Sequence, residues 1–199
     1  WQFQSEIEPQ ASINFHIFAG AEPKQNLQLF SRQVGLPQLP PDWAFGLSDY
    51  EVTRHTHMHG LLAGHRAVHL TDLHIDRYCL RHDRIVQNTG DLRPDWIVIT
   101  GDLLNVPEGL PHLFRFLGRL RDIAPVYMTL GNHDHYSGVS VTEYAELADR
   151  YKITLLVNQS AVVSVAGGEL VIVGVDDPSL HRADLRCLPT RADHRFTLL

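Results

Sequence analysis

The chain has 199 residues, of which 44% are hydrophobic and 20% are charged, and its formal net charge is −6. This length suits about one domain with a substantial buried core. The acidic balance excludes a protein that holds nucleic acid through bulk positive charge, because phosphate backbones are gripped by clustered Lys and Arg. Cys79 and Cys187 are too few for a disulfide framework and form no C-x-x-C motif.

The first 48 residues differ from the rest in their proline content and apolar pattern. Residues 1–48 contain five prolines and weak apolar periodicity, which predicts an irregular lead-in with one short helix around residues 25–33. Residues 49–199 are expected to form the folded domain. No stretch approaches the roughly 18 apolar residues of a membrane span, and no signal peptide pattern is visible. A cytoplasmic location, or one peripheral to the membrane, is the expectation.

Short apolar runs then alternate with segments of helical length. The runs lie about 30 residues apart, at Arg66–Thr71, Trp96–Thr100 and 126–130. The segments between them span residues 78–89 and Leu110–Arg121. Such alternation predicts βαβαβ connections and a largely parallel sheet, and hence an α/β fold.

The last 60 residues are richer in strand patterns. One more helix is expected at Val141–Tyr151. Two apolar segments, 161–165 and 169–175, flank a Gly-Gly pair and predict a hairpin. Residues 182–188 are interpreted as a short helix, and an apolar run begins at Phe196.

Polar side chains follow each apolar run of the predicted parallel sheet. Asp72 and His74 come after the first run, while Asp102 and Asn132 each follow a glycine after the second and third. The carboxyl ends of parallel strands meet at one edge of a sheet, so residues 30 and 60 positions apart can converge there. We therefore expect a site at this edge whose metal ligands are Asp72, His74, Asp102 and Asn132.

These ligand types predict a particular chemistry. Oxygen and imidazole ligands suit Mn, Fe or Zn, and two ions about 3.5–4 Å apart can activate a water and hold phosphate oxygens. Two divalent ions outweigh the charges of Asp72 and Asp102, so the site would attract phosphate although the chain is acidic. The pattern predicts hydrolysis of phosphate mono- or diesters by metal-activated hydroxide, with two divalent or trivalent ions as cofactors.

His133 and Asp134 are the predicted catalytic residues. His133 is interpreted as acting on the transition state, because a protonated imidazole can donate to a phosphate oxygen or to the leaving group. Asp134 is expected to orient that imidazole. Each motif alone has a structural alternative, since Gly-Asp and Asp or His after a strand are common turn chemistry. Their order and spacing favour the functional interpretation.

The ordered motifs resemble those of the calcineurin-like metallophosphoesterase superfamily. Its D-x-H, G-D and G-N-H-[DE] motifs match Asp72-Leu73-His74, Gly101-Asp102 and Gly131-Asn132-His133-Asp134. The resemblance covers about residues 50–199 and implies a β-sandwich flanked by helices. It implies further that Asp102 is shared between two metals, with Asp72 and His74 on one and Asn132 on the other, and that His133 is the catalytic histidine.

The resemblance also implies elements that this chain does not contain. The family's lone His and its G-H-x-H motif come after the strand that starts at Phe196, and the chain reaches its last residue first. The second sheet is therefore expected to be incomplete. The competing interpretation is a catalytically impaired fragment or relic, which binds metal or a partner without turnover.

A narrower resemblance concerns the substrate. Residues 131–135 followed by Gly138, and residues 174–178 (GVDDP), are similar to a bacterial, membrane-associated phosphodiesterase branch related to UDP-2,3-diacylglucosamine hydrolases. This implies a phosphate-ester substrate, with a lipid or a nucleotide-linked lipid as options, and membrane association through a segment upstream of Trp1. No nucleic-acid partner is expected.

Other histidines and acids receive structural interpretations. His55, His57 and His59 alternate along a predicted strand and are interpreted as solvent-facing, although such a row can bind metal adventitiously. Asp176 and Asp177 precede a proline, which favours a turn over a carboxylate pair. Four further histidines are not assigned to the site: His65, His69, His181 and His194.

Overall fold

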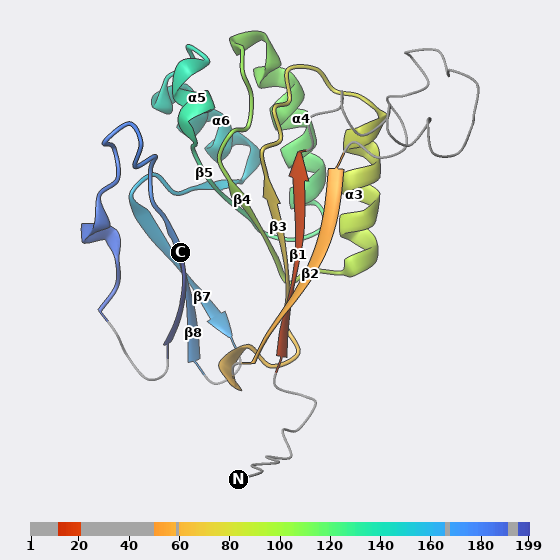
Figure 1. Cartoon of the computed structure of the whole chain (residues 1–199), viewed down its shortest axis with the longest axis vertical. Coiled ribbons are helices and arrows are strands. Elements are labelled where there is room, and N and C mark those ends of the chain that lie inside the picture. The colour runs from red at the N-terminus through yellow and green to blue at the C-terminus, as the bar shows by residue number, and fades with distance from the viewer. Residues whose placement is uncertain (1–11, 21–49, 59, 166–167, 191–194) are drawn as a thin grey trace, which may run out of the picture.

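The computed structural model describes residues 12–20, 50–58, 60–165, 168–190 and 195–199. Within these residues six strands form the larger of two sheets, in the order β2-β1-β3-β4-β5-β6 (Figure 1). The strands β3, β4, β5 and β6 run parallel to one another. Their bounds are β1 Ser12–Gly20, β2 Tyr50–Met58, β3 Arg66–Thr71, β4 Trp96–Thr100, β5 Val126–Thr129 and β6 Thr154–Leu155. The predicted parallel sheet is confirmed.

Strand β1 corrects one expectation. Residues 1–48 were expected to be irregular, but Ser12–Gly20 pair in parallel with β3 and antiparallel with β2. The helix expected around residues 25–33 lies outside the described residues. His55 and His57 lie on β2, as expected, while His59 is not among the described residues.

Helices cover one face of the larger sheet. The predicted helices are confirmed as α3 Leu80–Leu92, α4 Leu110–Arg121 and α6 Val141–Tyr151, and a further short helix, α5, spans Asn132–Tyr136. Helix α6 begins where Ser140 and Glu143 form a capping box, in which the Ser140 hydroxyl accepts from the Glu143 N–H at 3.2 Å. Figure 1 shows α3, α4 and α6 on the same side of the sheet.

Two apolar clusters hold these layers together. The cluster between sheet and helices includes Leu70, Ile99, Phe114 and Phe116, each at most 1% exposed. Burying each of these side chains stabilises the fold by about 1.5–3 kcal/mol. Because this cluster reaches the ends of β3, β4 and β5, it gives the loops that follow these strands a rigid base.

The second sheet packs on the opposite face. It contains β7 Gln159–Val165, β8 Gly168–Gly174 and β9 Arg195–Leu198, in that order. The predicted hairpin is confirmed as the antiparallel pair of β7 and β8, and β9 runs parallel to β8. Trp96 and Val98 of β4 pack with Ile172 of β8 between the two sheets. The α/β class and the two-sheet arrangement are therefore confirmed.

One remaining segment differs from the sequence-based expectation. The short helix expected at residues 182–188 is a single 3-10 turn, Leu185–Cys187. None of the helices in the described ranges is both long enough and apolar enough to cross a membrane.

Candidate metal centre and catalytic residues

The loops that follow β3 and β4 are joined by their backbones. The N–H of His74 donates to the carbonyl of Asp102 at 3.0 Å, and the N–H of Ile75 donates to the carbonyl of Leu103 at 2.7 Å. These bonds continue the pairing of β3 with β4 beyond the strand ends. Residues 30 positions apart in the sequence are thereby held side by side, as the strand spacing predicted.

Two glycines allow the β4 and β5 ends to touch. A Cβ on Gly101, which has φ +70°, would lie 2.7 Å from the Cα of Gly131, and one on Gly131 would lie 2.4 Å from Oδ1 of Asp102. Larger residues at either position would push the two loops apart. The glycines of the G-D and G-N-H-D motifs therefore place the Asp102 carboxylate against the start of α5.

Three predicted ligands converge at this edge. One ligand atom from each of Asp72, His74 and Asp102 lies within 4.8 Å of the other two, and all three residues are half-buried. All three also have left-handed backbones, with φ of 53°, 43° and 52°, among seven such non-glycine residues in the described ranges. A strained backbone costs about 1–3 kcal/mol per residue and clusters at functional sites.

The two carboxylates of this group lack a cationic partner. Across the described residues, neither Asp72 nor Asp102 takes part in an ion pair. Asp72 accepts from the Thr71 hydroxyl at 2.7 Å, and Asp102 accepts from the His133 N–H at 3.1 Å. Two negative charges beside an imidazole form a donor set that fits a divalent cation of the Mn, Fe or Zn type.

Asn132 lies at the same edge as these ligands. It is the first residue of α5 and stands between Gly131 and His133, both of which contact Asp102. In the described structure its side chain makes no hydrogen bond to the cluster. Its assignment as a metal ligand therefore stays a prediction.

His133 is exposed and lies next to the cluster. Its ring packs edge-on against that of His74, with 4.8 Å between ring centroids. Its Nδ1 lies 2.9 Å from Oδ1 of Asn105. The imidazole thus has a polar partner, but a different one from the partner that the sequence predicted.

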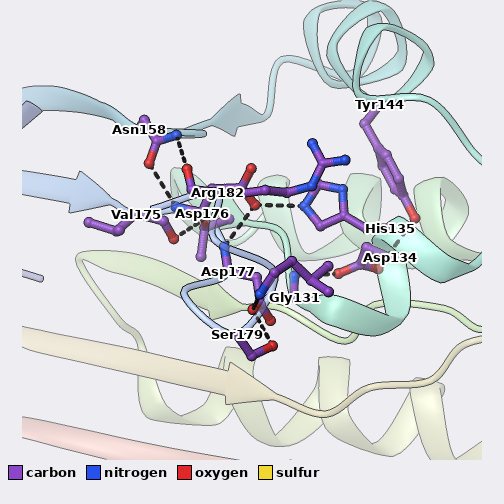
Figure 2. Close-up of polar contacts among 12 residues, drawn as sticks. Gly131, Asp134, His135, Tyr144, Asn158, Val175, Asp176, Asp177, Ser179 and Arg182 are labelled. Carbon is purple, nitrogen blue, oxygen red and sulfur yellow. Dashed lines mark hydrogen bonds and ion pairs between the residues drawn. The ribbon is translucent and has the colours of Figure 1, made fainter. Parts of the chain in front are cut away.

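Asp134 does not orient His133, so that interpretation is wrong. Its carboxylate accepts from the backbone N–H of Gly131 at 2.8 Å, and the Tyr144 hydroxyl lies 3.3 Å away (Figure 2). It also accepts from the backbone N–H of Leu103 at 2.9 Å. Burial raises the pKa of Asp134 above its usual value, while the backbone N–H donors act against that rise. Asp134 is fully buried and ties the start of α5 to the loop after β4.

Two residues at the site were missed by the sequence analysis. Asn105 Oδ1 lies 2.9 Å from Nδ1 of His74 as well as from Nδ1 of His133. Asp76 accepts from the backbone N–H of Asn105 at 2.8 Å and from its side-chain Nδ2 at 2.9 Å. The available signals were an acid two residues after His74 and an amide three residues after Asp102.

A buried hydrogen bond between His135 and Asp176 fixes the other end of α5. Nε2 of His135 lies 2.6 Å from Oδ1 of Asp176, and their side chains are 8% and 4% exposed. Figure 2 shows the two side chains pointing toward each other across the gap between α5 and the loop after β8. The predicted turn is present as well, since Asp177 accepts from the N–H of Leu180 at 3.0 Å. The sequence did not reveal that Asp176 also binds His135.

Comparisons with known proteins give a family match and several relatives. The family model described as calcineurin-like phosphoesterase matches residues 65–189. Two uncharacterized metallophosphoesterases of Bacillus subtilis (strain 168) are similar to the chain. YkoQ is 27% identical over 59% of this chain and 45% of its own length, and YkuE is 28% identical over 75% and 56%. The chain therefore spans about half the length of these relatives.

A solved structure shows a more distant likeness. Phosphopantetheinyl hydrolase (PptH) from Mycobacterium tuberculosis is 19% identical, with a TM-score of 0.39, over 55% of this chain and 41% of that chain. A likeness this distant says nothing about substrate.

The family match covers more than half of the chain and includes all three motifs. The chain belongs to the calcineurin-like phosphoesterase family.

Proposed function

We propose that this chain carries the metal-binding and acid-base residues of a hydrolase of phosphate mono- or diesters that uses two metal ions. The observation that carries the proposal is the convergence of Asp72, His74 and Asp102 within 4.8 Å. Bound ions would supply positive charge for phosphate oxygens and lower the pKa of a water. The family membership supports the same class of reaction.

Different side chains would bind the metal ions and transfer protons. Asp72 and His74 would hold one ion, Asn132 would hold the other, and Asp102 would be shared. His133 is exposed beside the cluster, where a protonated imidazole can donate to a phosphate oxygen or to the leaving group. Asp134 serves only to hold α5, and with it His133, in place.

A lipid-linked phosphate ester is the narrower substrate proposal. A cavity of about 120 Å³ lies between the two sheets and is lined by apolar side chains, including Tyr127, Met128 and Ile172. Thr100 also lines it, and its carbonyl oxygen lies 3.2 Å from the Thr71 hydroxyl, which donates to the ligand Asp72 at 2.7 Å. An apolar group could therefore sit beside the phosphate site. A location in the cytoplasm or at the membrane periphery, with no nucleic-acid partner, accompanies this proposal.

Hydrolysis with measured metal content tests the enzyme proposal against a relic. The purified protein is loaded with Mn²⁺ or Zn²⁺, its metal content is counted, and turnover of bis-p-nitrophenyl phosphate and p-nitrophenyl phosphate is followed. Two ions per chain with turnover is the expected result. One weakly held ion and no turnover with any metal would instead identify a relic that binds metal without catalysis.

A further inference from the structure

Asp76 and Asn105 form a fixed pair beside the metal cluster. One oxygen of Asp76 accepts from the backbone N–H of Asn105 at 2.8 Å, and the other accepts from the side-chain Nδ2 at 2.9 Å. The backbone N–H of Asp76 donates to the carbonyl of His74 at 3.0 Å. The carboxylate is thus held by a tight turn that starts at a metal ligand.

This pair decides which way the Asn105 amide faces. Both oxygens of Asp76 accept from N–H groups of Asn105, so the NH₂ end of the amide faces Asp76. The carbonyl oxygen must then face the opposite way. There it lies 2.9 Å from Nδ1 of His74 and 2.9 Å from Nδ1 of His133.

The amide oxygen in turn decides where both imidazoles carry a proton. A carbonyl oxygen accepts two hydrogen bonds and donates none, so both rings must present Nδ1–H. A neutral imidazole has a single N–H, and both rings therefore expose a free lone pair at Nε2. The edge-on packing of the rings of His74 and His133 fits two edges directed at one acceptor.

We propose that Asp76 is a positioning residue that sets the tautomers of His74 and His133 together, by fixing the amide of Asn105. His74 is left with Nε2 as its metal-binding atom. His133 is left with Nε2 as the atom that gains and gives up a proton. This last consequence rests on the proposed function, whereas the tautomers themselves do not.

Loss of the Asp76 carboxylate would remove this selection. In Asp76→Asn the residue facing Asn105 has an amide, which can both donate and accept. The Asn105 amide can then turn over and offer its NH₂ to the imidazoles, which accept only at an unprotonated Nδ1. The proton would move to Nε2, where it blocks metal binding by His74.

The imidazole tautomers are read by long-range ¹H–¹⁵N spectra of the purified, metal-free protein. The signals of the two rings are assigned with His74→Ala and His133→Ala. The wild-type protein should show the Nδ1–H form at both rings, and Asp76→Asn should show the Nε2–H form at a substantial fraction of both. Metal affinity should fall by about 10–100-fold, as for other residues that orient a ligand.

Two further variants keep the result decisive. Asp95→Asn makes the same change at the other end of β4 and should leave both tautomers and metal affinity unchanged. Asn105→Ala removes the shared acceptor directly and replaces Asp76→Asn if that variant does not unfold cooperatively on heating. Nε2–H at both rings of the wild-type protein, or unchanged Nδ1–H in both Asp76→Asn and Asn105→Ala, would overturn the proposal. If the protein shows these tautomer changes but no turnover, the result contradicts only the proposed function and leaves the role of Asp76 standing.

Discussion

Histidine and aspartate meet in this chain in two kinds of environment. At the start of β4, His65 lies 3.3 Å from Asp95, whose carboxylate also accepts from the N–H of Arg66 at 2.7 Å. At the far end of α5, His135 and Asp176 pair at 2.6 Å. In both pairs the carboxylate contacts the imidazole directly, and we call such a pair closed. At the ends of β3 and β4, Asp72, His74 and Asp102 form an open group.

The difference lies in the partner of the imidazole. His65 and His135 each face a carboxylate, whereas His74 faces the neutral amide of Asn105. A neutral partner leaves the nearby carboxylates uncompensated, and like charges close together need a cation. The same residue types form closed pairs where an acid contacts the imidazole, and they form the open group, which we propose to be functional, where it does not.

Asp102→Ala should show the largest effect of the open group. The change removes the ligand proposed to be shared by both ions, so metal affinity should fall by more than about 100-fold, because loss of a supporting residue alone costs about 10–100-fold. Calorimetric titration with Mn²⁺ or Zn²⁺ measures this loss. Asp95→Ala, in a closed pair, is the matched control and should bind metal as the wild-type protein does. Equal losses of metal affinity in both variants would contradict the distinction between open and closed groups.

His133→Ala should reduce catalysis and leave metal binding by the open group intact. Loss of a general acid lowers kcat by about 10²–10⁴-fold, while the ligand atoms stay in place. Turnover of a chromogenic phosphodiester and metal titration are measured on the same preparation. His181→Ala, which changes an exposed histidine that is not part of the cluster, should alter neither quantity. A His133→Ala protein that loses metal as severely as Asp102→Ala would contradict this division of roles.

Asp176→Ala should break a closed pair and reduce stability. His135 would remain buried without its acceptor, and the free energy of unfolding should fall by about 3 kcal/mol, as for other buried pairs that lose one partner. Urea unfolding followed by circular dichroism measures the change. Asp122→Ala disrupts an exposed pair with Arg121 and should change stability very little. Metal affinity lowered as far as in Asp102→Ala would place Asp176 with the open group.

Sequence patterns predicted the elements that form locally. Strands β3 and β4 and helices α4 and α6 have the bounds that their apolar periodicity indicated. Strand β1 was missed although Ile13, Phe15 and Ile17 alternate along it, because the prolines around it favoured an irregular segment. Its partner β3 begins more than 40 residues later, and no local sequence pattern indicates such a long-range pairing.

Part of the candidate site was predictable, because the local strand patterns were. The candidate metal ligands directly follow strands, so strand order alone brought Asp72, His74 and Asp102 together. The role of Asp134 was not predictable, because neighbouring residues on a helix point about 100° apart. The ring of His133 packs against His74, while the carboxylate of Asp134 turns to backbone N–H groups. The partners of Asn105 depend on three loops at once, which a one-dimensional pattern does not show.

A buried histidine outside the metal cluster extends the comparison to the pH dependence of stability. His82 of α3 is 1% exposed, and its Nδ1 accepts from the N–H of Cys79 at 2.9 Å. Burial, with a contribution from Arg81, lowers the pKa of His82 to about 4 from 6.5. Between these values the unfolded chain binds a proton that the folded chain does not. Stability should therefore fall as pH decreases, by about 2 kcal/mol between pH 6.5 and pH 5.

His82→Asn isolates this contribution. Asparagine can keep an acceptor near the Nδ1 position for Cys79, but it does not titrate. The difference in the free energy of unfolding between variant and wild-type protein should stay constant above pH 7 and shift in favour of the variant by about 2 kcal/mol at pH 5. Urea unfolding at several pH values measures it. A difference that does not change with pH would show that the folded protein accepts a proton at His82 as readily as the unfolded chain does.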